Sequence, residues 1–254
     1  MGDPLLDAHR VAERRYLLSG PQPISLRDQI LRGAAIVHRL KEIGEIAPNA
    51  PLVILGCGAG GATAAIEAAS FPKTEVFLVE RASTGFGVQR ACFTRTIDPT
   101  QYDWPLDHCY HGRLPWGVRH KHLPLYFPAQ RGSVLATWWA HDLVAAQSGL
   151  KRQAALKGHP PPLNCLFGAT ITSISSIVSA APKVAPKVIA LNIDIKEPSG
   201  KITSIRAGAL IEAIGFGTEN CRVEIPWTPT PRSTLCYEGQ PFWSDDQFTH
   251  LEPV

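Results

Sequence analysis

A run of glycines between two apolar segments restricts the fold of this chain more than any other feature of its sequence. The run Gly56-Cys-Gly-Ala-Gly-Gly61 directly follows the segment Leu52–Leu55 and opens the alanine-rich segment Ala59–Ser70. A short apolar run without alternation is typical of a strand buried on both faces of a parallel sheet, and alanine favours helix. A second apolar run, Glu75–Val79, follows Pro72. The pattern therefore predicts a β-α-β unit of about thirty residues.

The spacing of these glycines matches the GxGxxG pattern of a dinucleotide-binding site, in the strand-to-helix context that this site requires. Gly56 permits the tight turn, Gly58 lets a pyrophosphate approach the backbone, and Gly61 lets helix and strand pack closely. The start of the helix offers free N–H groups and a positive dipole end to the phosphates. Glu80 follows Gly61 by 19 residues, where a carboxylate accepts ribose hydroxyls and repels a 2′-phosphate. The sequence therefore favours FAD or NAD over NADP.

Two other interpretations of the glycine run stay open. One is a strand–helix turn that binds no ligand. The other is the GxGxG loop of an S-adenosylmethionine-dependent methyltransferase, in which Glu80 would hold the ribose of that cofactor. Such loops usually carry an acid two residues before the first glycine, where this chain has Ile54. The strand pattern between residues 165 and 214 is also foreign to the methyltransferase fold.

The rest of the chain is organised around this unit. Residues 25–45 predict a helix with Ser25 as its N-cap, and residues 133–147 predict another. Residues 83–130 lack periodicity and predict a long loop-rich insertion that contacts a ligand or a partner. Three strand-like runs follow a basic, proline-rich connection, and Glu197-Pro-Ser-Gly200 predicts a hairpin turn between the last two. The connection covers residues 151–162, and the runs cover residues 165–177, 187–195 and 202–214.

The segment Arg206–Gly215 gives a second indication of fold and function. It resembles the strand ending in Ala-x-Gly that FAD-dependent oxidoreductases of the glutathione-reductase-like, two-dinucleotide-binding class place after a β-meander. Together with the glycine run, the resemblance covers roughly residues 51–81 and 165–217. It implies an α/β, Rossmann-like FAD/NAD(P)-binding domain with a parallel sheet and a small antiparallel meander. It also implies a flavoprotein oxidoreductase, with FAD as cofactor or NAD as the alternative.

The same resemblance implies a set of residues around the ADP moiety. Arg81 would lie beside the ribose or adenine, the backbone near Ala169 and Thr170 would flank the adenine, and Gly215 would lie near the pyrophosphate. The predicted cofactor-binding residues are Gly56, Cys57, Gly58, Ala59, Gly60, Gly61, Glu80, Arg81, Thr170 and Gly215. No residue is assigned a catalytic role, because in such enzymes the flavin performs the hydride chemistry and the protein orients it.

The chain also departs from the pattern of this class. Its members normally carry, near the C-terminus, a strand followed by Gly-Asp, whose acid binds the ribityl chain. No Gly-Asp pair occurs after residue 217, and a second GxGxxG is missing. We therefore expect either the N-terminal part of an enzyme, completed by a C-terminal continuation or a partner chain, or a non-catalytic nucleotide-binding module. The expected domains are an N-terminal helical extension (1–48), the dinucleotide-binding domain (49–222) and an irregular C-terminal tail (223–254).

The remaining side chains and the composition point to no other class. Asp107, His108, Cys109 and His111 are ligand types without a paired metal-binding frame, so we predict no metal site, although they could act as acid or base on a substrate. The net charge of +3 and the lack of basic runs argue against nucleic acid. The sequence contains no apolar stretch of about 18 residues, so we predict no membrane span. The 6 scattered cysteines are typical of reduced thiols in a cytoplasmic protein.

Overall fold

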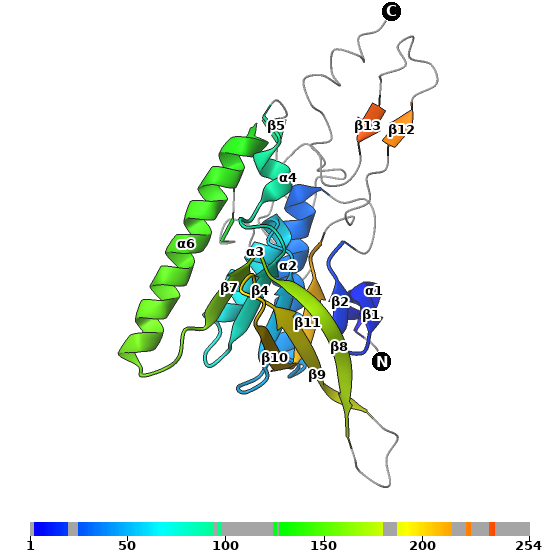
Figure 1. The fold of residues 1–254 in the computed structure, drawn as a ribbon, viewed down its shortest axis with the longest axis vertical. Coiled ribbons are helices and arrows are strands. Elements are labelled where there is room, and N and C mark those ends of the chain that lie inside the picture. Colours follow the sequence, from blue (N-terminus) through cyan, green and yellow to red (C-terminus); the bar gives the residue numbers. More distant parts are fainter. Residues whose placement is uncertain are drawn as a thin grey trace, which may run out of the picture.

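A mostly parallel sheet runs through the centre of the computed structural model (Figure 1). The structure describes residues 3–19, 25–93, 96–97, 124–125, 127–179 and 187–214, and the backbone of residues 222–224 and 234–236. Within these residues the sheet has the order β1-β2-β11-β3-β4-β7, parallel throughout except between β1 and β2. The strands cover Arg10–Ala12 (β1), Arg15–Leu17 (β2), Leu52–Leu55 (β3), Val76–Glu80 (β4), Leu163–Phe167 (β7) and Ala209–Glu212 (β11).

The glycine-containing unit folds as its sequence predicts. Strand β3 is followed by helix α3 (Ala59–Ser70) and then by β4. The two strands pair in parallel, from Leu52 opposite Val76 to Leu55 opposite Val79. The first three residues of β3 are fully buried, as expected for a strand that is covered on both faces.

Three helices cover one face of the sheet. They are α2 (Leu26–Glu42), α3 and α6 (Gly132–Leu156), and their apolar side chains pack with strand residues such as Ile54 and Leu78. Helix α2 begins with the predicted cap: the Ser25 hydroxyl accepts from the Asp28 N–H, and the Asp28 carboxylate accepts from the Ser25 N–H. No helix within the described residues is long and apolar enough to cross a membrane.

An antiparallel meander covers the opposite face. Its strands are β8 (Thr170–Val178), β9 (Val188–Lys196) and β10 (Ile202–Ala207), in the order β10-β9-β8. Its inner residues, including Ile193 and Ile205, pack against Val53, Val79 and Leu210 of the parallel sheet. The predicted hairpin turn is present, with the Gly200 N–H donating to the Glu197 carbonyl at 2.9 Å. The predicted fold class, α/β with a parallel sheet and a small antiparallel meander, is confirmed.

Two of the three predicted strand runs prove to be two strands each. The run 165–177 divides at Gly168, whose φ of +68° turns the chain from β7 into β8. The run 202–214 divides at Gly208, where a Cβ atom would overlap the Glu45 carbonyl oxygen. In both places the chain passes from one sheet to the other. The apolar pattern continues across the glycine because each sheet buries the apolar side chains of its own strand.

Other elements differ from the prediction in length. Helix α6 runs nine residues beyond the predicted end at Gln147, to Leu156. The remaining elements are α1 (Pro4–His9), α4 (Gly87–Arg90), β5 (Thr96–Ile97), β6 (Gln130–Arg131), β12 (Arg222–Glu224) and β13 (Thr234–Cys236). Antiparallel pairs of short strands also form where no strand was expected, at β1-β2, β5-β6 and β12-β13. The predicted domain boundaries at residues 48 and 222 stay a prediction.

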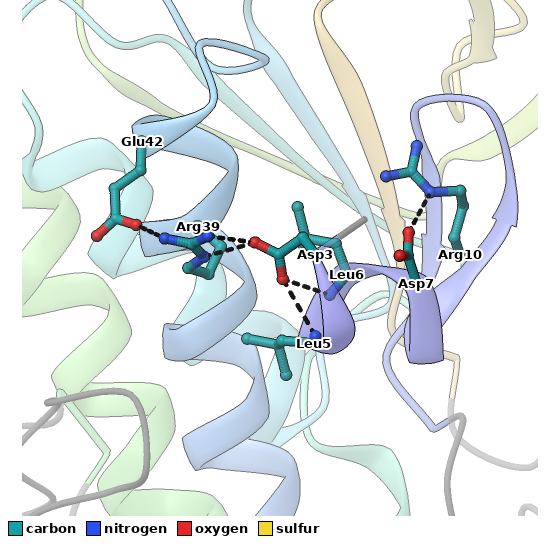
Figure 2. Close-up of polar contacts among 7 residues, drawn as sticks. All are labelled: Asp3, Leu5, Leu6, Asp7, Arg10, Arg39 and Glu42. Atoms are coloured by element: carbon teal, nitrogen blue, oxygen red, sulfur yellow. Dashed lines mark hydrogen bonds and ion pairs between the residues drawn. The ribbon is translucent and has the colours of Figure 1, made fainter. Parts of the chain in front are cut away.

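The N-terminal residues are tied to the helical layer by one carboxylate (Figure 2). One oxygen of Asp3 caps α1 by accepting from the N–H groups of Leu5 and Leu6, both at 3.1 Å. The other oxygen accepts from the Arg39 guanidinium of α2, whose Nε lies 2.7 Å away and which also pairs with Glu42. Helix α1 and strands β1 and β2 are thereby fixed beside α2 and the sheet.

Candidate functional site

The loop that joins β3 to α3 makes the predicted tight turn. Gly56 has a φ of +104°, a conformation that side chains with a Cβ rarely adopt. A Cβ atom there would also lie 2.6 Å from the carbonyl oxygen of Ala213, which follows β11. The Gly56 N–H donates to the Val79 carbonyl of β4 at 2.8 Å. The loop is therefore held between the carboxyl ends of three parallel strands.

Close packing also explains two further glycines of the motif. A Cβ atom at Gly61 would overlap the Gly56 carbonyl oxygen, so the first turn of α3 lies against the loop. A Cβ atom at Gly60 would overlap the Leu18 side chain and lie 2.9 Å from the Gln29 carbonyl oxygen. The sequence pattern predicted the role of Gly61, but it gave no signal that Leu18, far upstream, packs on this helix.

Gly58 differs from its neighbours because space lies in front of it. It is the N-cap of α3, it is partly exposed, and a Cβ atom there would have no heavy atom of the described residues within 4 Å. The first bond of the helix runs from the Ala62 N–H to the Gly58 carbonyl at 2.9 Å. The N–H groups of Ala59, Gly60 and Gly61 therefore have no acceptor inside the helix. This arrangement suits an anion that approaches the backbone.

Glu80 is bonded to the backbone on both sides of its carboxylate. One oxygen accepts from the Cys57 N–H and the other from the Ala82 N–H, each at 2.8 Å. A carboxylate oxygen has two lone pairs, so each oxygen of Glu80 can still accept one hydroxyl. The sequence pattern predicted Glu80 as a ribose ligand but not as the residue that fastens the loop.

The other predicted residues lie at different distances from this loop. Arg81 follows Glu80 and is exposed. Thr170 starts β8 beside the end of β4, because the neighbouring Ala169 N–H donates to the Glu80 carbonyl at 3.0 Å. Gly215 lies outside the described residues, as do the polar residues between positions 107 and 111. The structure thus brings Thr170 to the edge at which the glycine loop lies.

Cys57, inside the glycine run, is a buried thiol. Burial raises its pKa well above the ordinary range, with the neighbouring Cys165 and Glu80 acting in the same direction and Arg90 opposing them. Burial also raises the pKa of Cys165 to about 11. Both side chains are therefore protonated thiols near neutral pH, and the thiolate needed for nucleophilic or redox chemistry is disfavoured at each.

The segment after β4 folds back over the loop, which the sequence did not predict. The Phe86 N–H donates to the Cys57 carbonyl at 2.7 Å. A Cβ atom at Gly85 would lie 2.5 Å from the Cys57 sulfur, so this segment is in close contact with the loop. The Phe86 ring is buried and its centroid lies 5.8 Å from that of Trp139 in α6. The aromatic residues gave no periodic signal that places them at the site.

Comparisons with known proteins find likeness in structure only. No family model matches the chain, and no curated protein matches it. The crystal structure of L-lysine 6-monooxygenase from Pseudomonas syringae is 16% identical and covers 81% of this chain and 46% of its own, with a TM-score of 0.40. DfoA, a cadaverine monooxygenase from Erwinia amylovora bound to FAD, is 14% identical and covers 72% of this chain and 39% of its own, with a TM-score of 0.34. This chain thus spans less than half the length of either enzyme.

Proposed function

We propose that the loop Gly56–Gly61 and Glu80 bind the ADP moiety of FAD. On this proposal the chain is a flavin-dependent oxidoreductase, or the nucleotide-binding portion of one. The observation that carries it is the open space around the Cβ position of Gly58, which is the N-cap of a helix whose first N–H groups lack an intrahelical acceptor. At every other glycine of the motif, neighbouring atoms occupy the Cβ position, whereas the Cβ position of Gly58 leaves room for a ligand.

The residues of the loop edge fit the parts of ADP. The backbone of Gly58 and Ala59 would take the pyrophosphate, and the free lone pairs of Glu80 would accept the ribose hydroxyls. Thr170 would lie at the adenine and Gly215 at the pyrophosphate. Bound flavin would supply hydride chemistry, and the protein residues would bind and orient it. NAD shares the ADP moiety and is the alternative ligand of the same residues.

A single methyl group added at Gly58 tests the proposal. Gly58 has a φ of −83°, which any residue adopts, so Gly58→Ala leaves the backbone unstrained and fills only the open space. We expect the wild-type protein to bind FAD and ADP in a calorimetric titration, and to show flavin absorbance after excess FAD is removed. Gly58→Ala should weaken ADP binding about tenfold or more.

Gly149→Ala is the matched control, since Gly149 lies in α6 and a Cβ atom there also meets no atom within 4 Å in the part of the chain that the structure describes. It should bind ADP as the wild type does. A wild-type protein that binds neither FAD nor ADP would refute the proposal. In that case titrations with NAD and with S-adenosylmethionine would show whether the loop takes another nucleotide.

A further inference from the structure

Phe86 has a backbone conformation that is unusual for a bulky residue. Its φ of 61° and ψ of 34° lie in the left-handed region, where an aromatic side chain is an outlier. Such conformations persist only where the surrounding structure holds them, and they are frequent at functional sites. Phe86 is fixed by its buried ring, which packs on Trp139, and Trp139 in turn packs on Phe127 with 5.2 Å between ring centroids.

The N–H of Phe86 donates to the glycine loop from this unusual conformation. The Cys57 carbonyl accepts from it at 2.7 Å, while the Cys57 N–H donates to Glu80 at 2.8 Å. Both backbone groups of Cys57 are thus bonded to the chain at or after the end of β4. The neighbouring segment is fixed as well, because the Arg90 side chain donates from Nε to the Gly85 carbonyl at 2.9 Å.

The direction of the Cys57 carbonyl determines the direction of the next N–H group. The carbonyl of Cys57 and the N–H of Gly58 belong to one planar, trans peptide unit, so they point in opposite directions. Since the carbonyl points to Phe86, the Gly58 N–H points away from Phe86. Gly58 is the residue of the loop with open space in front of it.

We propose that Phe86 is a positioning residue for phosphate recognition: its buried, left-handed conformation holds the Cys57–Gly58 peptide so that the Gly58 N–H meets the pyrophosphate of a bound dinucleotide. This inference rests on the proposed ADP site. Phe86 contacts no ligand in this scheme and acts through the peptide that it holds. Its loss should therefore reduce the binding of phosphates and leave the binding of adenosine unaffected.

The test compares ADP with adenosine in Phe86→Ala, which removes the ring and keeps the N–H. We expect the ratio of the ADP affinity to the adenosine affinity to fall about tenfold, because a hydrogen bond to a charged phosphate is lost. If Phe86→Ala does not fold, Phe86→Leu keeps apolar bulk and loses the ring contact with Trp139. Leu143→Ala, a buried α6 residue, controls for loss of stability, and its ratio should match that of the wild type.

A measurement without ligand separates this inference from the proposed function. Hydrogen exchange of the Cys57 amide, which is bonded to Glu80, and of the amide at position 86, which is bonded to Cys57, should accelerate about tenfold or more in the Phe86 variant, relative to the amides of β3. Leu143→Ala should not show this local effect. Unchanged exchange at the loop, or an unchanged affinity ratio, overturns the positioning role. If exchange is faster in the Phe86 variant but the wild-type protein binds no ADP, the proposed function is refuted. The phosphate part of this inference is then refuted with it.

Discussion

At the scale of single residues, Glu80 joins the loop to the strand that follows it. Glu80→Gln keeps the size of the side chain, but its amide group has one acceptor oxygen for the two N–H donors of Cys57 and Ala82. One donor then faces an NH₂ group, and we expect the free energy of unfolding to fall by about 1–3 kcal/mol. Urea denaturation measures this loss. The exposed Glu13 provides the control, since Glu13→Gln should change stability by less than about 0.5 kcal/mol.

The sequence predicted the glycines of this loop better than it predicted their partners. Gly56 and Gly61 could be assigned because each position of GxGxxG has one steric requirement, and the structure shows the predicted turn and packing. The bond from Glu80 to Cys57 joins residues 23 positions apart through a side chain and a backbone group. Such a bond leaves no periodic trace in a sequence. The contact of Phe86 with the loop escaped prediction for the same reason.

At the scale of elements, α2 and α3 pack through a pair of glycines. A Cβ atom at Gly33 of α2 would lie 2.5 Å from the Gly60 carbonyl oxygen of α3. Gly33→Ala must therefore push the helices apart at the start of α3, and we expect a loss of about 1–3 kcal/mol in unfolding free energy. Gly149→Ala in α6, which meets open space, should instead raise it by up to about 1 kcal/mol through helix propensity. Equal effects of the two substitutions would contradict a close helix contact at Gly33.

The elements themselves were predictable where apolar runs stood between glycine or proline signals. Helix α3 matches the predicted Ala59–Ser70, and Ser25 was predicted as the N-cap of α2. The division of two long β runs at Gly168 and Gly208 was not predicted, because the residues on both sides of each glycine are apolar and favour strand. Only the position of a second sheet in space decides where such a run divides.

At the scale of the whole molecule, the N-terminal residues support the predicted ligand edge. Strand β2 extends the parallel sheet beside β11, and Arg15 donates from Nε and Nη2 to one oxygen of Glu212, at 3.1 and 2.6 Å. Leu18, which directly follows β2, donates its N–H to the Glu212 carbonyl, and its side chain packs on Gly60. The contacts of this segment are therefore made at the end of β11 and at the start of α3, next to the glycine loop.

The packing of the N-terminal segment (residues 3–19) against the sheet and helix α2 should depend on pH through His9. Its ring is buried, and its Nδ1 donates to the Leu17 carbonyl at 2.8 Å, which assigns the proton of the neutral ring to Nδ1. Burial lowers the pKa of His9 below 6.5, and the positive charge of Arg32 acts in the same direction, although the bond to Leu17 opposes them. Between pH 6.5 and the lower pKa of the folded state, the unfolded chain therefore binds a proton that the folded chain excludes.

Stability should accordingly be complete above pH 6.5 and fall as the pH decreases from 6.5 toward the lower pKa of the folded state, by at most about 1.4 kcal/mol per pH unit. His9→Gln keeps a donor for the Leu17 carbonyl and does not titrate, so it should flatten this dependence in urea denaturation at pH 7.5 and 5.5. The exposed His141 of α6 is the control, and His141→Gln should leave the wild-type slope unchanged. A His9→Gln protein that retains the full wild-type slope would show that another group carries the pH dependence, and that docking of the N-terminal segment does not require a neutral imidazole.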